Sequence, residues 1–367
     1  MRGLYIHIPF CVSKCFYCDF YSVPEKLELM DEYVQVLLAE ADGYRGMDFS
    51  TLYFGGGTPS ILGAERLEKL INGLRRRFDL HDLQEATIEA NPESAGIDLL
   101  ATAYSLGIGR ISIGAQSLNE DELRKAGRAH NRRQVLETIS AALSSGFCNI
   151  SVDIMIGLPG QTEQSLDNTL NILAGAGINH ISAYCLSVEE GTVFYRCPPP
   201  DLPNEDAQAG LFESAVDILG KHGFAHYEIS NFARPGSECL HNLNYWRGGE
   251  YLGLGAAAAS HIDGKRFRNA ASLERYLANP LSAGEGEERL RDVRKAGEEA
   301  MLRLRLIQEG LDMEEMTGKY GLTAVERLEA RLNELVERRM LAREGYIYRL
   351  QPERVLTSNS VFVDVIG

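Results

Sequence analysis

Near its N-terminus the chain reads Tyr5-Ile6-His7-Ile8-Pro9-Phe10-Cys11-Val12-Ser13-Lys14-Cys15-Phe16-Tyr17-Cys18-Asp19-Phe20, a short apolar run followed by three closely spaced cysteines. Three thiolates at this spacing can converge on one ion or cluster, and soft sulfur ligands favour iron–sulfur or zinc. Because the motif supplies only three cysteines, a four-iron cluster held by it would keep one iron open for a small molecule. The alternative is a structural zinc ion completed by His7.

Short apolar or β-branched runs recur along the first half of the chain. They are Leu4–Ile8, Thr51–Phe54, Ala86–Ala90, Arg110–Gly114, Ile150–Ile156 and His180–Leu186. Segments with helical spacing lie between them, such as 31–41, 64–77 and 132–144. This alternation predicts an α/β fold of parallel strands joined by crossover helices.

Six strand–helix units suit either an incomplete TIM-like barrel or an open doubly wound sheet. The polar residues favour the barrel, because they follow or end successive strands: the cysteines, the glycine run 55–57, Glu89 and Gln116. Polar groups at the carboxyl ends of strands are what the active face of a barrel requires. We therefore predict a partial (β/α)6 TIM-like barrel.

Composition limits the partners of the chain. Its 367 residues are 44% hydrophobic and carry a formal net charge of −15, which argues against coating nucleic acid or an anionic membrane. No apolar run approaches the roughly 20 residues that span a bilayer, so no membrane span is expected. The chain enters a predicted strand at Leu4, which leaves no room for a signal peptide and predicts a cytoplasmic location.

The C-terminal region reads differently from the barrel. Around Gly284–Glu288 the composition becomes rich in Gly and Glu, which predicts a linker. Helical patterns over 298–308, 313–320 and 324–338 then lead to a predicted β-ribbon at 345–350, as in a small winged-helix-like domain. The third helix mixes acidic and basic residues, which is typical of a solvated surface rather than a DNA reader.

The cysteine segment with its flanks resembles the radical SAM signature, and in particular the oxygen-independent coproporphyrinogen III oxidase family. The resemblance runs along nearly the whole chain. It implies a [4Fe–4S] cluster held by Cys11, Cys15 and Cys18, together with S-adenosylmethionine (SAM). It also implies a radical SAM barrel over 1–235, a connecting segment over 236–288 and a C-terminal domain over 289–367.

Further residues match positions that line the SAM site in this family. They are Tyr5, Tyr17, Gly56, Gly57, Thr58, Glu89, Gln116, Arg128 and Asp153. Arg128 suits a carboxylate, whereas Gln116 and Asp153 suit ribose hydroxyls. From the residues alone, the glycine run could be a tight turn, and Glu89 could belong to a structural salt bridge.

The family contains enzymes and heme chaperones. Its dehydrogenases decarboxylate a porphyrinogen, carry a further cysteine where this chain has Phe20, and have an N-terminal arm where only four residues precede Tyr5. In contrast, His241-Asn242-Leu243-Asn244-Tyr245-Trp246 resembles the HNxxYW motif of the heme chaperones. The resemblance therefore implies heme as a third cofactor, with His241 as candidate ligand and Cys239 as its rival.

The chaperone branch implies delivery of heme to acceptor hemoproteins, including respiratory ones. It allows a homodimer formed around the cluster, and transient docking at a membrane where the acceptor lies there. Two alternatives stay open at this point: a radical SAM dehydrogenase acting on a porphyrinogen, and a zinc-stabilised protein with no redox role.

Overall fold

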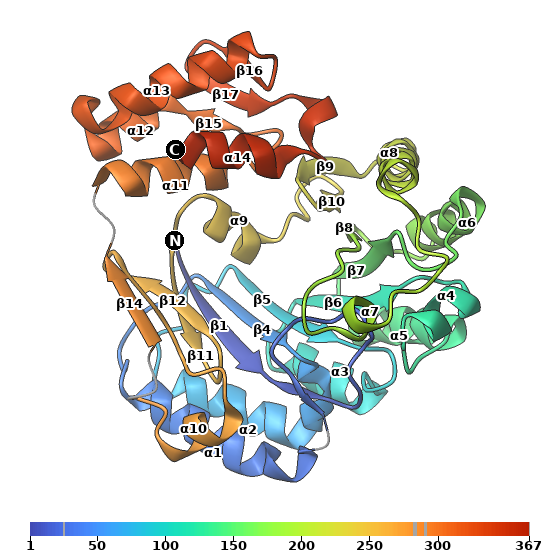
Figure 1. Ribbon diagram of the computed structural model, residues 1–367. Coiled ribbons are helices and arrows are strands. Elements are labelled where there is room, and N and C mark those ends of the chain that lie inside the picture. Colours follow the sequence, from blue (N-terminus) through green and yellow to red (C-terminus); the bar gives the residue numbers. More distant parts are fainter. Residues whose placement is uncertain (25, 282–284, 290–291, 367) are drawn as a thin grey trace.

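The computed structural model describes residues 1–24, 26–281, 285–289 and 292–366. Its centre is a row of six parallel strands, shown in Figure 1. They are β1 (Arg2–Ile8), β4 (Thr51–Gly56), β5 (Glu85–Ala90), β6 (Arg110–Gln116), β7 (Asn149–Ile156) and β8 (His180–Cys185). The six predicted strands are thereby confirmed. Neighbours in space follow the chain order, with no reversal, which excludes the doubly wound alternative and confirms the partial barrel.

Helices cover the outer side of these strands (Figure 1). They are α1 (Met30–Asp42), α2 (Gly63–Arg75), α3 (Ile97–Ser105), α4 (Glu120–Lys125), α5 (Arg132–Ser145), α6 (Glu163–Ala174) and α8 (Glu205–Lys221). The short helix α7 (Val193–Arg196) lies instead at the carboxyl ends of the strands, where Phe194 packs against Phe16 of the cysteine loop. Helix α2 buries Leu67, Leu70 and Leu74, whose spacing of three to four residues places them on one face. Helix α5 begins with a capping box between Asn131 and Gln134, which satisfies its first backbone donors.

The sheet continues beyond the barrel at both edges. Strand β11 (Glu250–Leu254) pairs with β1 in parallel, and β12 (Ala259–Ile262), β13 (Lys265–Arg268) and β14 (Glu285–Arg289) follow in antiparallel order. At the other edge, β10 (Asn231–Ala233) and β9 (Ala225–Glu228) extend from β8. The predicted connecting segment thus contributes four strands to the main sheet. Gly284 lies outside the described residues, and residues 285–288 of the predicted linker lie in β14.

Four short elements complete the description of this part of the chain. Strand β2 (Phe10–Cys11) pairs in parallel with β3 (Val23–Pro24). Helix α9 (Leu240–Trp246) contains the HNxxYW motif, and α10 (Leu273–Ala278) packs near α1.

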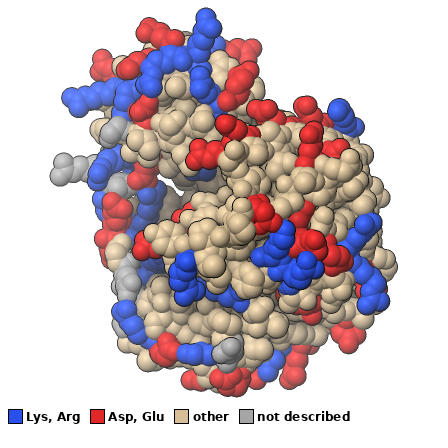
Figure 2. All heavy atoms as spheres, turned by 45° about the vertical axis from the view of Figure 1, so that its right-hand side comes forward, with Lys and Arg blue, Asp and Glu red and all other residues tan. Residues whose placement is uncertain are grey.

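The C-terminal domain lies beside α9 and the N-terminus (Figure 1). It contains α11 (Asp292–Arg303), α12 (Met313–Tyr320), α13 (Leu322–Glu337), α14 (Ser358–Ile366) and the strands β15 (Leu311–Asp312), β16 (Leu341–Glu344) and β17 (Ile347–Leu350). The predicted helices and ribbon are confirmed, although α11 ends at Arg303 rather than at residue 308. Lys/Arg and Asp/Glu side chains are intermixed over this domain in Figure 2, and Arg338 and Arg343 of this domain pair with Asp364 and Glu329.

Candidate functional site

The three cysteines of the N-terminal motif gather at the carboxyl end of β1. Cys11 ends β2, and Cys15 and Cys18 lie in the loop that follows. Backbone hydrogen bonds hold this loop in place, from Phe16 N to Ala126 O (3.1 Å) and from Cys18 N to Cys15 O (3.2 Å). The loop is therefore fixed to a segment more than a hundred residues away in the chain.

One cavity of about 360 Å³ opens beside these cysteines and is lined by the ends of the parallel strands. The structure brings all the predicted cluster and SAM residues to it except Tyr5. Those that line it are Cys11, Cys15, Tyr17, Cys18, Gly56, Gly57, Thr58, Glu89, Gln116, Arg128 and Asp153. Tyr5 lies deeper in the barrel, where its hydroxyl hydrogen-bonds His7 Nδ1 at 3.1 Å.

The glycine run is more than a tight turn, because side chains would collide with the site. Gly56 has φ +113°, and a Cβ there would lie 2.6 Å from the His7 ring. A Cβ on Gly57 would lie 2.7 Å from the Phe10 carbonyl oxygen. Glycines at these positions let the end of β4 pass directly against the cysteine loop.

Two half-buried carboxyl groups face the cavity. Glu89 accepts hydrogen bonds from the Tyr53 hydroxyl (2.8 Å) and Gly56 N (3.2 Å), and among the described residues it forms no ion pair at contact distance. Burial raises the pKa of Glu89 to about 7, and the nearby charge of Asp153 adds to this rise. Asp153 accepts a hydrogen bond from Ser112 Oγ at 3.0 Å, and burial raises its pKa as well.

Arg128 joins the cysteine loop to the strand ends. Its Nη1 donates to Cys15 Sγ at 3.1 Å, and its Nη2 donates to Asn91 Oδ1 (2.8 Å) and to the Gly114 carbonyl (2.7 Å). Its Nε is buried and has no hydrogen-bond partner among the described residues. Because an unpaired buried donor is costly, this nitrogen is available for a ligand.

One strained backbone position lies at the same cavity. Gln116 has φ +68° at a register shift between β6 and β7. A non-glycine residue in this region carries a conformational cost of order 1 to 3 kcal/mol, and such costs concentrate at functional sites. The bulge directs the end of β6 into the cavity.

His7 does not lie free to complete a zinc site. Its Nδ1 meets the Tyr5 hydroxyl, and its Nε2 meets the Tyr21 carbonyl at 3.1 Å. Burial lowers the pKa of His7 to about 4. Two cysteine sulfurs bound to one tetrahedral zinc ion would lie about 3.8 Å from each other. Among the described residues, no three His, Cys, Asp or Glu side chains are arranged closely enough to hold a single metal ion.

The structure places His241 away from the cavity that the three cysteines line. Its Nδ1 hydrogen-bonds Thr51 Oγ1 and its Nε2 hydrogen-bonds the Tyr245 hydroxyl, both at 2.8 Å. A Cβ on Gly3 would lie 2.9 Å from its Cε1, so the ring sits at the start of β1. Along β1, Gly3 lies five residues before Ile8, which is near the cysteines, and five residues of extended strand span about 17 Å.

Helix α9 buries His241, Leu243 and Asn244 at this end of the barrel. His241 is 1% exposed, and burial lowers its pKa to about 3. Glu85 accepts hydrogen bonds from the backbone nitrogens of Leu240 and His241, both at 3.0 Å. The rival ligand Cys239 is also buried, and its pKa is raised to about 12 by burial.

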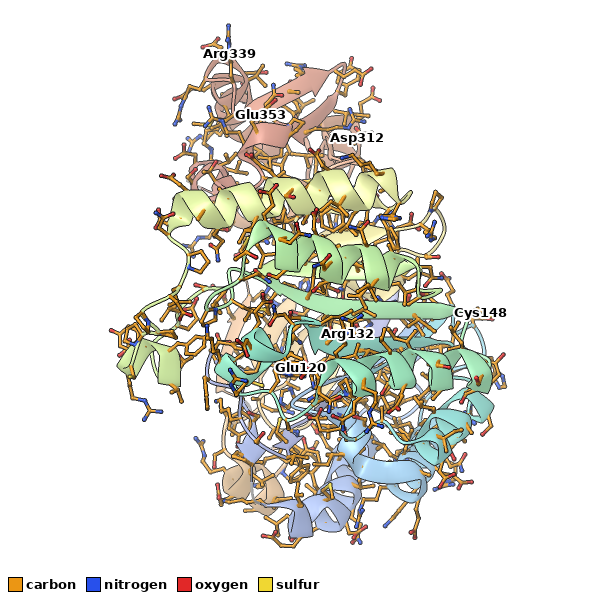
Figure 3. All side chains as sticks on the ribbon, turned by 90° about the vertical axis from the view of Figure 1, so that its right-hand side faces the viewer. Glu120, Arg132, Cys148, Asp312, Arg339 and Glu353 are labelled. Carbon is orange, nitrogen blue, oxygen red and sulfur yellow. The ribbon has the colours of Figure 1, made fainter. Side chains whose placement is uncertain are left out.

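Several residues at the site were missed from the sequence. Asn91, Ser112 and Tyr184 line the cavity, and Arg110 lies below it with its Nε buried and without a partner in the described chain. The period of two along strand β5 could have indicated Asn91, since it lies on the same face as Glu89. Cys185 lines the cavity as well, whereas Figure 3 shows Cys148 at the outer edge of the sheet, just before β7.

Comparisons with known proteins agree with this architecture. Residues 5–173 match the radical SAM superfamily, and residues 294–355 match the HemN C-terminal domain. The heme chaperone HemW of Lactococcus lactis subsp. lactis is 34% identical over 365 residues, which cover 98% of this chain and 96% of that protein. The heme chaperone HemW of Escherichia coli (strain K12) is 40% identical over 277 residues, covering 72% of each.

A solved structure shows the same fold. Coproporphyrinogen III oxidase (HemN) from Escherichia coli, described as a radical SAM enzyme, superposes with a TM-score of 0.88 at 21% identity, over 100% of this chain and 90% of that one.

Proposed function

The chain belongs to the HemW family of radical SAM proteins, and we propose that it binds a [4Fe–4S] cluster, SAM and heme, and delivers heme to acceptor hemoproteins. The observation that carries the first part is the cavity at the strand ends, which the three cysteines and all the predicted SAM residues except Tyr5 line together. The names of the relatives support the second part.

The residues present fit a cluster and SAM. Cys11, Cys15 and Cys18 would hold the cluster by their thiolates, leaving one iron for SAM. The unpaired Nε of Arg128 is a donor suited to the SAM carboxylate, and Glu89 offers negative charge to its ammonium group. Gln116 and Asp153 suit the ribose hydroxyls. When bound, the two groups would supply one-electron reductive chemistry.

The protein's own part is positioning. The glycines at 56 and 57 let the end of β4 pass against His7 and the Phe10 carbonyl, and Tyr53 and the Gly56 amide fix the Glu89 carboxyl group. Ser112 fixes Asp153 in the same way. Because these groups are held by hydrogen bonds before any ligand arrives, little reorganisation is needed on binding.

Heme ligation by His241 is part of this proposal and carries a structural requirement. Both ring nitrogens are hydrogen-bonded, so ligation needs at least one of the contacts to Thr51 or Tyr245 to break. The guanidinium of Arg305 lies over Trp246 of α9 (5.1 Å) and over Phe362 of α14 (4.8 Å). Movement of α9 is therefore tied to the C-terminal domain.

The proposal extends to location and partners. Thiolate ligands call for a reducing compartment, which supports the cytoplasm, and a homodimer and a respiratory acceptor remain predictions. No helix in the described part of the chain is long and apolar enough to cross a bilayer. The alternative porphyrinogen dehydrogenase remains disfavoured, since the position that resembles its additional cysteine is Phe20, which is 67% exposed beside the cavity.

The test combines cluster analysis with heme titration. Protein reconstituted without oxygen should contain four iron and four sulfide per chain by the cluster's composition, and alanine at the three cysteines should remove them. Hemin should give a Soret band that weakens or shifts in His241→Ala but not in His81→Ala, which removes an exposed histidine. A wild-type chain without cluster would refute the radical SAM part, and identical hemin spectra would refute His241 as ligand.

A further inference from the structure

A continuous chain of hydrogen bonds connects two of the three cluster cysteines across the rim of the barrel. The Thr58 hydroxyl donates to Cys11 Sγ (3.4 Å), and Asn91 Nδ2 donates to Thr58 Oγ1 (3.0 Å). Arg128 donates from Nη2 to Asn91 Oδ1 (2.8 Å) and from Nη1 to Cys15 Sγ (3.1 Å). We refer to Thr58, Asn91 and Arg128 as the rim arc.

The direction of every bond in the rim arc follows from Arg128. A guanidinium can only donate, so the Asn91 oxygen must face it and the Asn91 amino group must face Thr58. The Thr58 oxygen therefore accepts from Asn91, and its own proton is free to point at Cys11. The Asn91 amide thus orients two donors, the Thr58 hydroxyl toward Cys11 and the Arg128 guanidinium toward Cys15.

The fold builds the rim arc from three separate units. Thr58 follows the glycines of β4, Asn91 follows β5, and Arg128 follows α4. Gly114 of β6 makes room for the meeting point, because a Cβ there would lie 2.6 Å from Asn91 Oδ1 and 3.2 Å from Arg128 Nη2. Ser60 Oγ, 3.2 Å from Asn91 N, fixes the backbone of the central residue.

Hydrogen bonds to ligand sulfur alter the properties of an iron–sulfur cluster. Reduction adds negative charge, and part of it resides on the sulfurs, so a donor aimed at sulfur stabilises the reduced state and raises the reduction potential. Partners of metal ligands also fix the orientation of those ligands. The rim arc supplies such donors to Cys11 and Cys15 and leaves Cys18 outside.

We propose that Asn91 is a positioning residue for the cluster, which through Thr58 and Arg128 orients Cys11 and Cys15 and raises the reduction potential. This inference rests on the proposed function only in requiring that the three cysteines hold the cluster. It gives Thr58 and Arg128 a role toward sulfur in addition to any contact with SAM.

The test measures the midpoint potential of the reconstituted cluster without SAM, by redox titration followed by electron paramagnetic resonance. Thr58→Val removes one donor while keeping the shape of the side chain, and Asn91→Leu removes the link. Both should shift the potential to more negative values. The midpoint potential of the double variant should be no more negative than that of Asn91→Leu alone, because both changes interrupt the same chain of hydrogen bonds.

Ser105→Ala is the control, because Ser105 Oγ of α3 donates only to the Thr102 backbone oxygen (2.8 Å) among the hydrogen bonds of the described residues and does not line the cavity. Its potential should equal that of the wild type. Thr58→Val keeps the test decisive if Asn91→Leu fails to load the cluster. An unchanged potential in a fully loaded Thr58→Val protein would overturn the inference, whereas a wild-type chain that holds no cluster would overturn the proposed function instead.

Discussion

The half-buried carboxyl group of Glu89 gives SAM binding a pH dependence that can be worked out. Its pKa is raised to about 7, mainly by burial, so about half of the groups are ionised at pH 7 and about one in eleven at pH 6. The amino group of SAM, with an ordinary pKa near 7.7, stays protonated over this range. If the cation binds only the ionised form, its affinity should fall about fivefold, or about 1 kcal/mol, between pH 7 and pH 6.

Equilibrium dialysis of radiolabelled SAM against the reconstituted protein measures this slope. Glu89→Gln should bind SAM more weakly at pH 7 and should show a nearly flat profile. Glu93→Gln is a suitable control, because the pKa of Glu93 is lowered and its carboxyl group stays ionised at both pH values. A flat wild-type profile, or an unchanged slope in Glu89→Gln, would refute the assignment of Glu89 to the cation.

Three further perturbations test the packing described above. Gly114→Ala should force Asn91 and Arg128 apart and lower the free energy of unfolding by about 1 to 3 kcal/mol in urea denaturation, whereas Gly109→Ala, which points into open space, should not. Gly3→Ala should push against His241 and lower the melting temperature, with Gly210→Ala as its control; equal melting temperatures would contradict the placement of the ring. The pKa of His241 is lowered to about 3 in the folded chain, against about 6.5 in the unfolded chain. Between these two pH values the unfolded chain binds one more proton than the folded chain, so the free energy of unfolding should fall as the pH drops through this window. His241→Gln should show a smaller acid loss in the same titration, and parallel curves would exclude a buried neutral imidazole.

The barrel and the meeting of the predicted site residues at its strand ends were largely predictable, because both depend on patterns that are local in the sequence. Continuous β-branched runs produced strands such as β7, and the glycines and cysteines that follow strands must meet at one end of a parallel sheet. The spacing of two residues between Glu89 and Asn91 likewise predicts that both lie on the same face at the end of β5. The link from Asn91 to both sulfurs, in contrast, depends on side chains from three strand–helix units and could not be derived from spacing.

Two other features show where sequence reasoning stops. The motif at His241 indicates a ligand by its residue types, but its burial depends on where a seven-residue helix docks, which only the tertiary structure determines. The Gly- and Glu-rich segment was interpreted as a linker, yet residues 285–289 pair with β13, and Lys265 meets Glu287 at 2.9 Å. Pairing with an edge strand outweighs weak strand propensity there.

The bond between Arg128 and Cys15 spans 113 positions of the chain and has a consequence for biosynthesis. A nascent polypeptide emerges from the ribosome with its thiols first, long before the guanidinium that orients one of them has been translated. We therefore expect cluster insertion to wait until α4 and Arg128 have left the exit tunnel, which requires synthesis of more than a third of the 367-residue chain.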